Sequence, residues 1–371
     1  MALTHRERIL NVLSGKGSRN DRPPYFPDLS YYFEVRRKLG RMPAEYADCQ
    51  TLLDLHKKMD VGLPVHLYGE VYSISYDESV RIETIQYPDG HDKIISTPVG
   101  SVRERRRSVM PGESASRVEY MVKTVEDLKV IEYTFRHRTL RPTYEKVKQA
   151  LDAMGEYGFV DLVLPRSPMP HLIIDLANLE NGLYLMMDHP DECEHFFEVC
   201  SEANDIAFDL MGECPYGTVC IFGDNIDEVM VSPSMFKRYS LPYYQRRCER
   251  LHKSGKLVSA HMDGRLKGLL PMMKETGLDI FDGATPEPMN DWTLEEMAKA
   301  LGPNQRLWCG VPATLFCDGT TVQQVKDFSK RILDAFGSKV VLNVGDQLPP
   351  DGDLARVAAS AEVAAGYGKT G

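Results

Sequence analysis

The sequence predicts an α/β protein, a (β/α)8 TIM barrel with an inserted antiparallel β-meander and N-terminal helices. Three observations lead to this fold class. From Thr143 onward, helical patterns alternate with short apolar runs, and two earlier runs at Pro24 and Leu63 bring the expected strands to eight. Between about Ser79 and Val109 the period changes to two, as in antiparallel strands. No G-x-G-x-x-G or P-loop follows any run, which disfavours a doubly wound sheet.

The elements are expected in a regular order along the chain. Thr4 followed by Glu7 forms a capping box that starts a first helix. A first strand over 24–28 and two short helices, 31–39 and 51–59, precede a second strand over 63–68. After the meander, we expect strands at 159–165, 218–224, 256–261, 279–284, 306–311 and 339–344, preceded in turn by helices at 143–154, 172–188 with 190–211, 233–252, 266–275, 294–301 and 322–336. With a closing helix over 353–364, this forms one expected domain, 1–371.

The predicted meander carries turn signals and a group of arginines. Pro88-Asp89-Gly90 and Thr97-Pro98-Val99-Gly100 mark two turns, and the stretch that follows contains Arg103, Arg105, Arg106 and Arg107. Charged side chains protect an edge strand from aggregation, so a solvated edge is the favoured interpretation. Binding of an acidic substrate by these arginines is the alternative.

Composition excludes several classes of function. The chain has 371 residues and a net charge of −10, so nothing favours binding to nucleic acid or to an anionic membrane. No apolar run is long enough to span a membrane, and the first residues lack the apolar region of a signal peptide. The eight cysteines form no C-x-x-C pair and are expected to be reduced. A cytoplasmic enzyme is therefore expected.

Polar residues at the predicted strand ends nominate a site. In the run 256–264, His261 and Asp263 are two residues apart and would emerge on the same side of a strand that feeds a helix. In a TIM barrel all strand ends face one mouth, where catalytic residues lie. The other strand-end residues are Asp28, Tyr68, Arg166, Asp224 with Asn225, Glu287, Cys309 and Asp346.

Each of these residues also has a purely structural explanation. His261 could be a hydrogen-bonded core histidine and Asp263 a helix N-cap. Asp224 and Asp346 could cap turns, Glu287 lies in a Pro-Glu-Pro loop that could be exposed, and Cys309 could pack in the barrel. Their expected convergence on one mouth favours a metal site with nitrogen and oxygen ligands or a proton-transfer site.

Taken together, these residues resemble the uroporphyrinogen decarboxylase superfamily over most of the chain. The resemblance is densest between residues 224 and 350. It is carried by Asp224-Asn225, Val231-Ser232-Pro233-Ser234-Met235-Phe236, Leu241-Pro242-Tyr243-Tyr244, His261-x-Asp263-Gly264, Glu275-Thr276-Gly277-Leu278-Asp279 and Gly345-Asp346-Gln347-Leu348-Pro349-Pro350. The superfamily implies one of two chemistries: cofactor-free decarboxylation of porphyrinogens, or zinc-dependent methyl transfer involving a corrinoid carried on a separate protein.

Departures from the family patterns separate these chemistries. Decarboxylases carry an arginine-rich string on the first strand, and this chain has Phe26-Pro27-Asp28-Leu29-Ser30-Tyr31-Tyr32 instead. A substrate with many carboxylates needs charged partners, so porphyrinogen decarboxylation is disfavoured. The thiol methyltransferases bind zinc through a His-x-Cys pair and a later Cys. His261 matches, but Asp263 and Asp346 replace the thiolates, so a thiol substrate is less expected.

The segment from Tyr87 to Gly100 resembles the meander of methyltransferases that demethylate methoxylated compounds. The resemblance therefore implies an O-demethylase component that moves a methyl group from a methoxyaromatic or related donor to the cobalamin of a corrinoid protein. A carboxy-lyase acting on a smaller acid and a non-catalytic ligand-binding barrel are the alternatives.

The expected site residues fall into three groups. Catalytic roles are expected for His261, Asp224 and Glu287, and zinc ligation for His261, Asp263 and Asp346. Substrate contacts are expected from Phe26, Asp28, Tyr31, Tyr68, Asn225 and Met262. The expected cofactors are zinc and partner-borne cobalamin, and the expected partners are the methyl donor and the corrinoid protein; a homodimer is left open.

Overall fold

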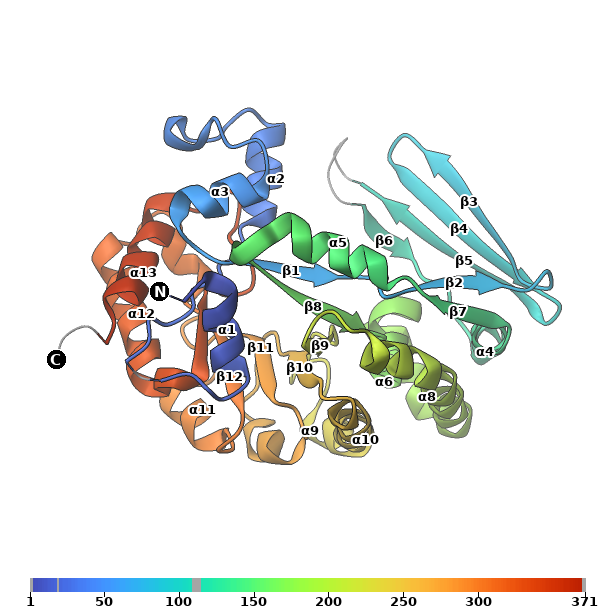
Figure 1. Ribbon diagram of the computed structural model, residues 1–371. Helices are drawn as coiled ribbons and strands as arrows, with labels where there is room; N and C mark the ends of the chain where they lie inside the picture. The colour runs from blue at the N-terminus through green and yellow to red at the C-terminus, as the bar shows by residue number, and fades with distance from the viewer. Residues whose placement is uncertain (1–2, 19, 109–114, 369–371) are drawn as a thin grey trace. The chain divides into compact units, whose positions relative to one another are not determined.

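The computed structural model describes residues 3–18, 20–108 and 115–368, and Figure 1 shows their arrangement. The chain divides into two compact units. The barrel unit comprises Met1–Val71, Tyr144–Leu164 and Met211–Gly371, and the meander unit comprises Tyr72–Thr143 and Pro165–Leu210. The chain therefore leaves the barrel unit twice, after its first and its second assigned strand.

The barrel unit is built on a curled parallel sheet of seven strands among the described residues. Every neighbouring pair is parallel, and helices connect most of the strands, so the predicted α/β alternation is confirmed. In sheet order the strands are β1 (Leu63–Leu67), β8 (Gly158–Leu164), β9 (Val219–Phe222), β10 (Leu257–His261), β11 (Ile280–Ala284), β12 (Arg306–Gly310) and β13 (Val340–Asn343).

The expected first strand is present only as an isolated bridge. Phe26 donates its backbone N–H to Leu342 at 2.9 Å, and the N–H of Gly62, just before β1, donates to Tyr25 at 3.0 Å. This segment therefore hydrogen-bonds to β13, at one edge of the seven-stranded sheet, and to the residue that precedes β1, at the other edge. Proline has no N–H to donate to a ladder, and Pro23, Pro24 and Pro27 flank the bridge, so it does not lengthen into a strand. Among the described residues the sheet of the barrel unit thus has seven assigned strands where eight were expected.

Helices and short helical turns surround this sheet. The predicted capping box at Thr4 and Glu7 is present at the start of α1 (His5–Leu13). Two predicted helices differ in detail: 233–252 is divided into three pieces, and 266–275 is a short 3-10 segment. The helical elements are α2 (Ser30–Lys38), η1 (Ala44–Tyr46), α3 (Leu52–Met59), α5 (Tyr144–Met154), η2 (Gly155–Tyr157), α9 (Pro233–Met235), η4 (Phe236–Ser240), α10 (Leu241–Lys253), η5 (Leu270–Glu275), α11 (Leu294–Ala300), η6 (Ala313–Phe316), α12 (Val322–Phe336), η7 (Gly337–Lys339) and α13 (Leu354–Gly366).

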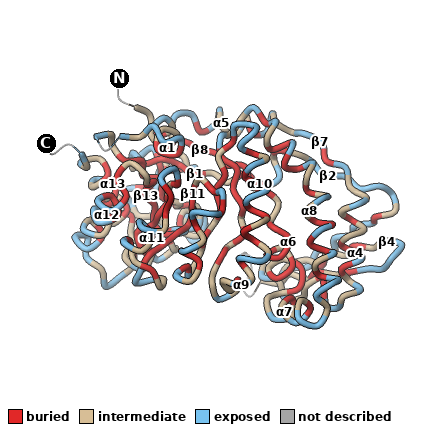
Figure 2. Tube along the Cα trace, turned by 90° about the horizontal axis from the view of Figure 1, so that it is seen from below, coloured by how far each residue is buried: buried red, intermediate tan, exposed pale blue. Residues whose placement is uncertain are grey.

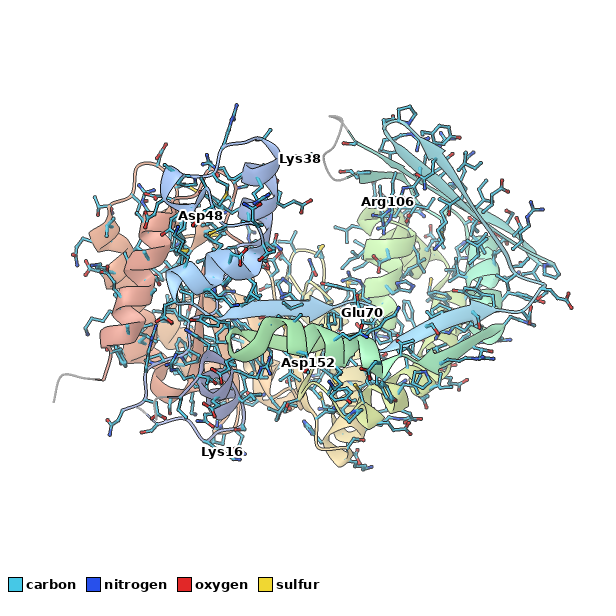
Figure 3. All side chains as sticks on the ribbon, turned by 45° about the horizontal axis from the view of Figure 1, so that its top comes forward. Lys16, Lys38, Asp48, Glu70, Arg106 and Asp152 are labelled. Atoms are coloured by element: carbon cyan, nitrogen blue, oxygen red, sulfur yellow. The ribbon has the colours of Figure 1, made fainter. Side chains whose placement is uncertain are left out.

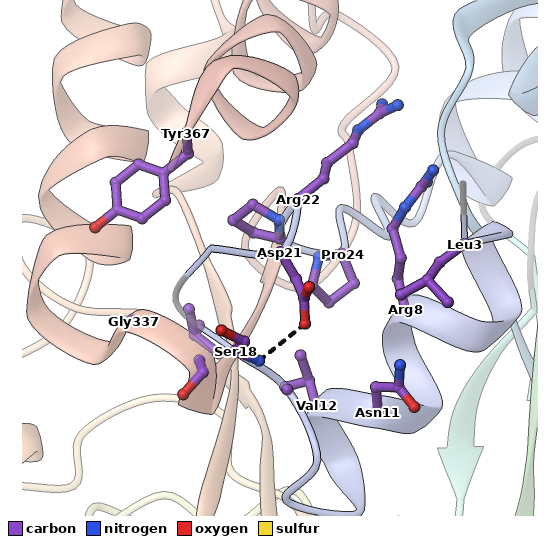
Figure 4. A pocket seen from close by; sticks show the side chains of 14 residues that line it. Leu3, Arg8, Asn11, Val12, Ser18, Asp21, Arg22, Pro24, Gly337 and Tyr367 are labelled. Atoms are coloured by element: carbon purple, nitrogen blue, oxygen red, sulfur yellow. Dashed lines mark hydrogen bonds between the residues drawn. The ribbon is translucent and has the colours of Figure 1, made fainter. Parts of the chain in front are cut away.

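Helix α1 packs against a buried core formed by the strands. The helix contributes Ile9, Val12 and Leu13, and the other members are Phe26, Phe159, Val219, Ile280, Trp308 and Val341. Figure 2 shows this burial along the strands, with exposed positions on the outer helices. A crevice beside α1 has a volume of only about 10 Å³, room for about one water molecule, so it is not a ligand site (Figure 4).

The meander unit contains two antiparallel sheets and several helices. Its larger sheet confirms the predicted meander and extends it by one strand, whereas Val109, the expected end, lies outside the described residues. The larger sheet has the order β3 (Arg81–Tyr87), β4 (Gly90–Thr97), β5 (Gly100–Arg107), β6 (Ser116–Glu119), and the smaller pairs β2 (Tyr72–Tyr76) with β7 (Arg138–Pro142). The helices are α4 (Val125–Arg136), α6 (Pro168–Pro170), η3 (His171–Leu176), α7 (Leu179–Asp188) and α8 (Pro190–Glu213), of which α8 runs on into the barrel unit.

No described helix combines the length and the apolar character needed to cross a membrane.

Candidate active site

A histidine and an aspartate from neighbouring strands meet at the carboxyl ends of β10 and β11. His261 and Asp282 are register partners, and His261 Nδ1 donates to Asp282 Oδ2 at 2.8 Å. Asp282 is buried, and the His261 side chain is 16% exposed. Because the carboxylate holds one ring nitrogen, the other, Nε2, is the nitrogen left to meet a substrate.

A second pair of the same kind lies on β1 and β8. His66 and Asp161 are also register partners, and His66 Nδ1 lies 2.9 and 2.8 Å from the two Asp161 oxygens. Asp161 is 2% exposed, so its charge requires this partner. Electrostatic interactions of Asp161 with His261, and of His66 with Asp282, show that the two pairs share one neighbourhood.

The carboxylates keep both histidines protonated at higher pH than usual. Burial lowers the pKa of His66, but the charge of Asp161 and the hydrogen bond to it outweigh burial and raise the pKa to about 10. Burial also lowers the pKa of His261, yet the hydrogen bond and charge of Asp282 produce a net increase, to which Asp346 and Asp263 add. At neutral pH His66 is therefore an imidazolium next to the buried Asp161, and the pKa of His261 lies above its ordinary value.

Three other predicted residues lie around His261 or close to the strand ends. Asp346 Oδ1 lies 3.6 Å from His261 Nε2, beyond hydrogen-bond distance, and the Asp346 side chain is 54% exposed. Asp263 is partly buried and raises the pKa of His261. Asp28 accepts from the backbone N–H of Ser30 at 2.8 Å, and its charge acts on His66. The predicted grouping of His261, Asp263 and Asp346 is thus present as neighbouring charges.

Three of the predicted site residues are enclosed in the packed interior. Phe26 is fully buried in the core beneath α1. Asp224 is fully buried, and it accepts a hydrogen bond from the Tyr244 hydroxyl at 2.8 Å. Met262 is fully buried too, and alternation along the strand turns it away from the side of His261. These three side chains are not brought to an open mouth.

The remaining predicted residues lie outside the assigned strands, Tyr31 on helix α2 and the others on loops. Glu287 is exposed, as its structural explanation anticipated, and its backbone N–H donates to Trp292. Tyr31 and Tyr68 are 48% and 70% exposed. Asn225 has a φ of 49°, in the left-handed region. Arg166, also expected at a strand end, belongs to the meander unit, where it pairs with Asp175 at 2.8 Å.

Sequence reasoning missed Asp282, His66 and Asp161, although each left a signal. Each is a single ionisable residue inside an otherwise apolar strand. A charged group is almost never fully buried without a partner, so an aspartate in one such strand and a histidine in another indicate a buried pair. The missing information was the register that makes them neighbours.

The backbone of β11 is shaped around the His261 ring. Gly283 has a φ of +71°, and a Cβ at this position would lie 2.4 Å from His261 Cε1. The pairing of β11 with β12 shifts register between Phe281 and Ala284. Register shifts of this kind occur next to active sites, and here the shift includes Gly283, whose missing Cβ leaves room for the imidazole.

The donor groups do not fit a three-ligand zinc site in the described arrangement. Within the described part of the chain, no three histidine, cysteine, aspartate or glutamate side chains are grouped to hold a metal ion. His261 Nδ1 is bonded to Asp282, and seven of the eight cysteines, Cys309 included, are buried free thiols.

The fold is similar to the folds of solved structures. The structure is similar to a "methyltransferase from Methanosarcina mazei" with a TM-score of 0.64 and 15% identity, covering 98% of this chain and 99% of that chain. At this identity the similarity shows a common fold. A putative vitamin-B12 independent methionine synthase from Listeria monocytogenes has 10% identity and a TM-score of 0.45, with 94% of this chain and 97% of that chain covered.

A search of curated proteins gives no match. The family model described as "Uroporphyrinogen decarboxylase (URO-D)" matches residues 109–367, well over half of the chain. The protein therefore belongs to the uroporphyrinogen decarboxylase family.

Proposed function

We propose that this protein is a methyltransferase component that moves a methyl group from an O-methyl donor, such as a methoxyaromatic compound, to the cobalamin of a separate corrinoid protein. Family membership and the fold shared with a methyltransferase support this class of reaction. The observation that carries the proposal is the His261–Asp282 pair at the end of β10, whose geometry suits a proton donor to a leaving oxygen.

In the proposed reaction, this chain contributes the proton that the leaving oxygen takes up. The reduced corrinoid would supply the electron pair that takes up the methyl group. As the carbon–oxygen bond breaks, its electrons stay on the donor oxygen, and His261 Nε2 would transfer its proton to that oxygen, so that a neutral phenol or alcohol leaves. Without protonation the oxyanion is a poor leaving group at neutral pH.

The surrounding carboxylates would orient His261 and help to reprotonate it after each transfer. Asp282 fixes the ring through Nδ1 and stabilises the imidazolium before transfer. Asp346, half exposed and 3.6 Å from Nε2, is suited to guide a replacement proton from solvent.

The test uses free cobalamin, chemically reduced, as the methyl acceptor and a methoxyphenol as the donor. Formation of demethylated product and the absorbance change of the corrinoid are followed together. We expect His261→Ala to lower the rate by about 100-fold or more, the usual contribution of a general acid.

His252→Ala is the matched control. His252 Nε2 pairs with Asp279 Oδ2 at 2.7 Å in the same unit, but its side chain is 39% exposed, and Asp279 precedes β11, at the amino end of that strand. Replacing His252 should leave the rate within about twofold of the wild-type rate, because it removes only a partly exposed histidine–aspartate pair. If His261→Ala retains wild-type turnover, the histidine is structural and the proposal fails.

Cofactor-free decarboxylation is the second candidate. Protonated His66, with its pKa raised to about 10, offers a cation for a substrate carboxylate, and His261 could protonate the carbanion left as carbon dioxide departs. Carbon dioxide release without added corrinoid would favour this lyase over the methyltransferase.

Zinc at His261, Asp263 and Asp346 stays a prediction. Metal analysis of dialysed protein tests it: one zinc per chain that is lost in His261→Ala and Asp346→Ala would confirm it. Such a result would require these side chains to move from the described positions.

A further inference from the structure

The meander unit contains a cavity of about 430 Å³ lined by residues of that unit alone. Its volume is in the range of small-molecule sites, and its walls come from both small sheets, α4, η3 and α8. Neither proposed reaction uses it. Figure 3 labels Arg106, one of the residues on its wall.

Positive charge exceeds negative charge in this cavity. Its lining includes five cationic side chains but only two carboxylates; the cations are Lys93, Arg106, Arg117, Arg138 and Arg166, and the carboxylates are Glu104 and Asp175. The net surplus makes the cavity attractive to an anion.

The two carboxylates arrange the arginines. Glu104 is buried; its Oε1 accepts from Arg106 Nε at 2.8 Å and its Oε2 from Arg117 Nε at 2.5 Å. Asp175 accepts from Arg166 Nε at 2.8 Å. Because these bonds use the inner nitrogen of each guanidinium, the planar ends are held in fixed directions. Such preorganisation lowers the entropy cost of binding an anion.

Arg138 also has a buried N–H group that lacks a hydrogen-bond acceptor among the described residues. Its Nη2 donates to the Ala203 carbonyl at 2.9 Å and to Asn204 Oδ1 at 2.7 Å, and its guanidinium lies over the Phe135 ring. Its Nε is buried, yet no described group accepts its hydrogen. A buried donor without a partner is costly, and a ligand oxygen would satisfy it.

The wall beside these cations is apolar and aromatic. Tyr72, Ile74 and Tyr76 alternate along β2 so that all three share one face and line the cavity with Phe135. Ile74 and Tyr76 remain 45% and 37% exposed. Exposed apolar residues next to a cationic cluster suit a ligand with a flat apolar body and an acidic group.

We propose that this cavity binds a small aromatic carboxylate, with the carboxylate held by Arg106 and Arg138 and the ring against Tyr72 and Tyr76. Planar guanidinium groups match the geometry of a carboxylate and also stack on rings. This inference does not depend on the reaction at His261.

The experiment titrates the whole chain with benzoate by calorimetry, with neutral benzamide and inorganic phosphate as comparison probes. Benzoate should bind, benzamide should bind at least about tenfold more weakly, and added salt should weaken benzoate binding. Arg106→Ala and Arg138→Gln should each lower the affinity for benzoate by about tenfold or more.

Arg103→Ala is the matched control, because Arg103 lies on the same strand, pairs with Glu119 and does not line the cavity. It should leave the affinity unchanged. Arg106 is partly exposed, so its variant should fold even if Arg138→Gln does not; far-ultraviolet circular dichroism verifies this.

Three results would overturn the inference. The first is no benzoate binding by the wild-type chain at millimolar concentration, and the second is unchanged affinity in Arg106→Ala. The third is phosphate binding tighter than benzoate, which would assign the cavity to a phosphorylated ligand. Loss of benzoate binding in His261→Ala but not in Arg106→Ala would instead place benzoate in the barrel unit.

Discussion

Replacing Gly283 by alanine should damage the His261 site from the backbone. At a φ of +71° an alanine is strained, by about 1–2 kcal/mol. The new Cβ would also lie 2.4 Å from His261 Cε1 and 2.7 Å from Nδ1, so the ring must move. That movement breaks the 2.8 Å bond to Asp282, a charge-assisted bond worth about 1.5–3 kcal/mol. We expect a loss of roughly 2.5–5 kcal/mol in the free energy of unfolding.

Gly255→Ala separates the two contributions. Gly255 has a φ of +75°, but a Cβ there would meet nothing within 4 Å, so it should cost only the backbone strain of about 1–2 kcal/mol. Urea denaturation of both variants measures the difference. In a His261→Ala background, the loss of unfolding free energy caused by Gly283→Ala should fall to that caused by Gly255→Ala, because the imidazole ring is no longer present. If Gly283→Ala is as mild as Gly255→Ala with His261 in place, the proposed fit of backbone to imidazole is wrong.

Three further predictions concern the same unit. Asp282→Asn removes the negative charge that helps to raise the His261 pKa, so in a pH–rate profile the activity that needs imidazolium should be lost at lower pH than in the wild type; an unmoved profile would contradict this. The His66 pKa of about 10 in the folded state exceeds its ordinary value of 6.5, so the contribution of this histidine to stability is complete below pH 6.5 and is lost as pH rises through 10. Burial raises the pKa of Asp161, so protonation of this carboxyl in acid also removes the charge pair. The stability advantage of the wild type over Asp161→Asn, measured by urea denaturation, should therefore be largest near pH 6.5 and shrink as pH rises toward 10. Phe26→Ala should lose about 3–5 kcal/mol of unfolding free energy, as for core aromatics, and a loss below 1 kcal/mol would argue against its core position.

The fold was largely readable because hydrophobic periodicity is a local signal. Each apolar run after residue 158 that the sequence predicts as a strand is a strand, and the meander lies where the period of two begins. The run at Pro24 failed as a strand because three prolines limit its ladder to a bridge. The division into two units could not be foreseen, because it depends on contacts between segments far apart in the chain.

The site was only partly readable for the same reason. The strand-end rule located His261, and alternation alone would have turned Met262 away from it. Asp282 and Asp161 become partners of His261 and His66 through strand register, which no single segment encodes. Glu287 and Asp224 follow strands as expected, but one is solvent-exposed and the other enclosed, and burial depends on neighbours that periodicity does not identify.

The two departures of the chain from the barrel unit constrain how the protein is made on the ribosome. The meander unit needs both 72–143 and 165–210, so it cannot be complete until β8, a barrel strand, has been synthesised between them. Likewise β1 must wait for β8, its neighbour in the sheet, while the whole of 72–143 is translated. Domains that fold as units during synthesis usually do so one after the other. Here neither unit can finish first from a continuous stretch, so removing the meander unit by engineering would require two junctions, Val71 to Tyr144 and Leu164 to Met211.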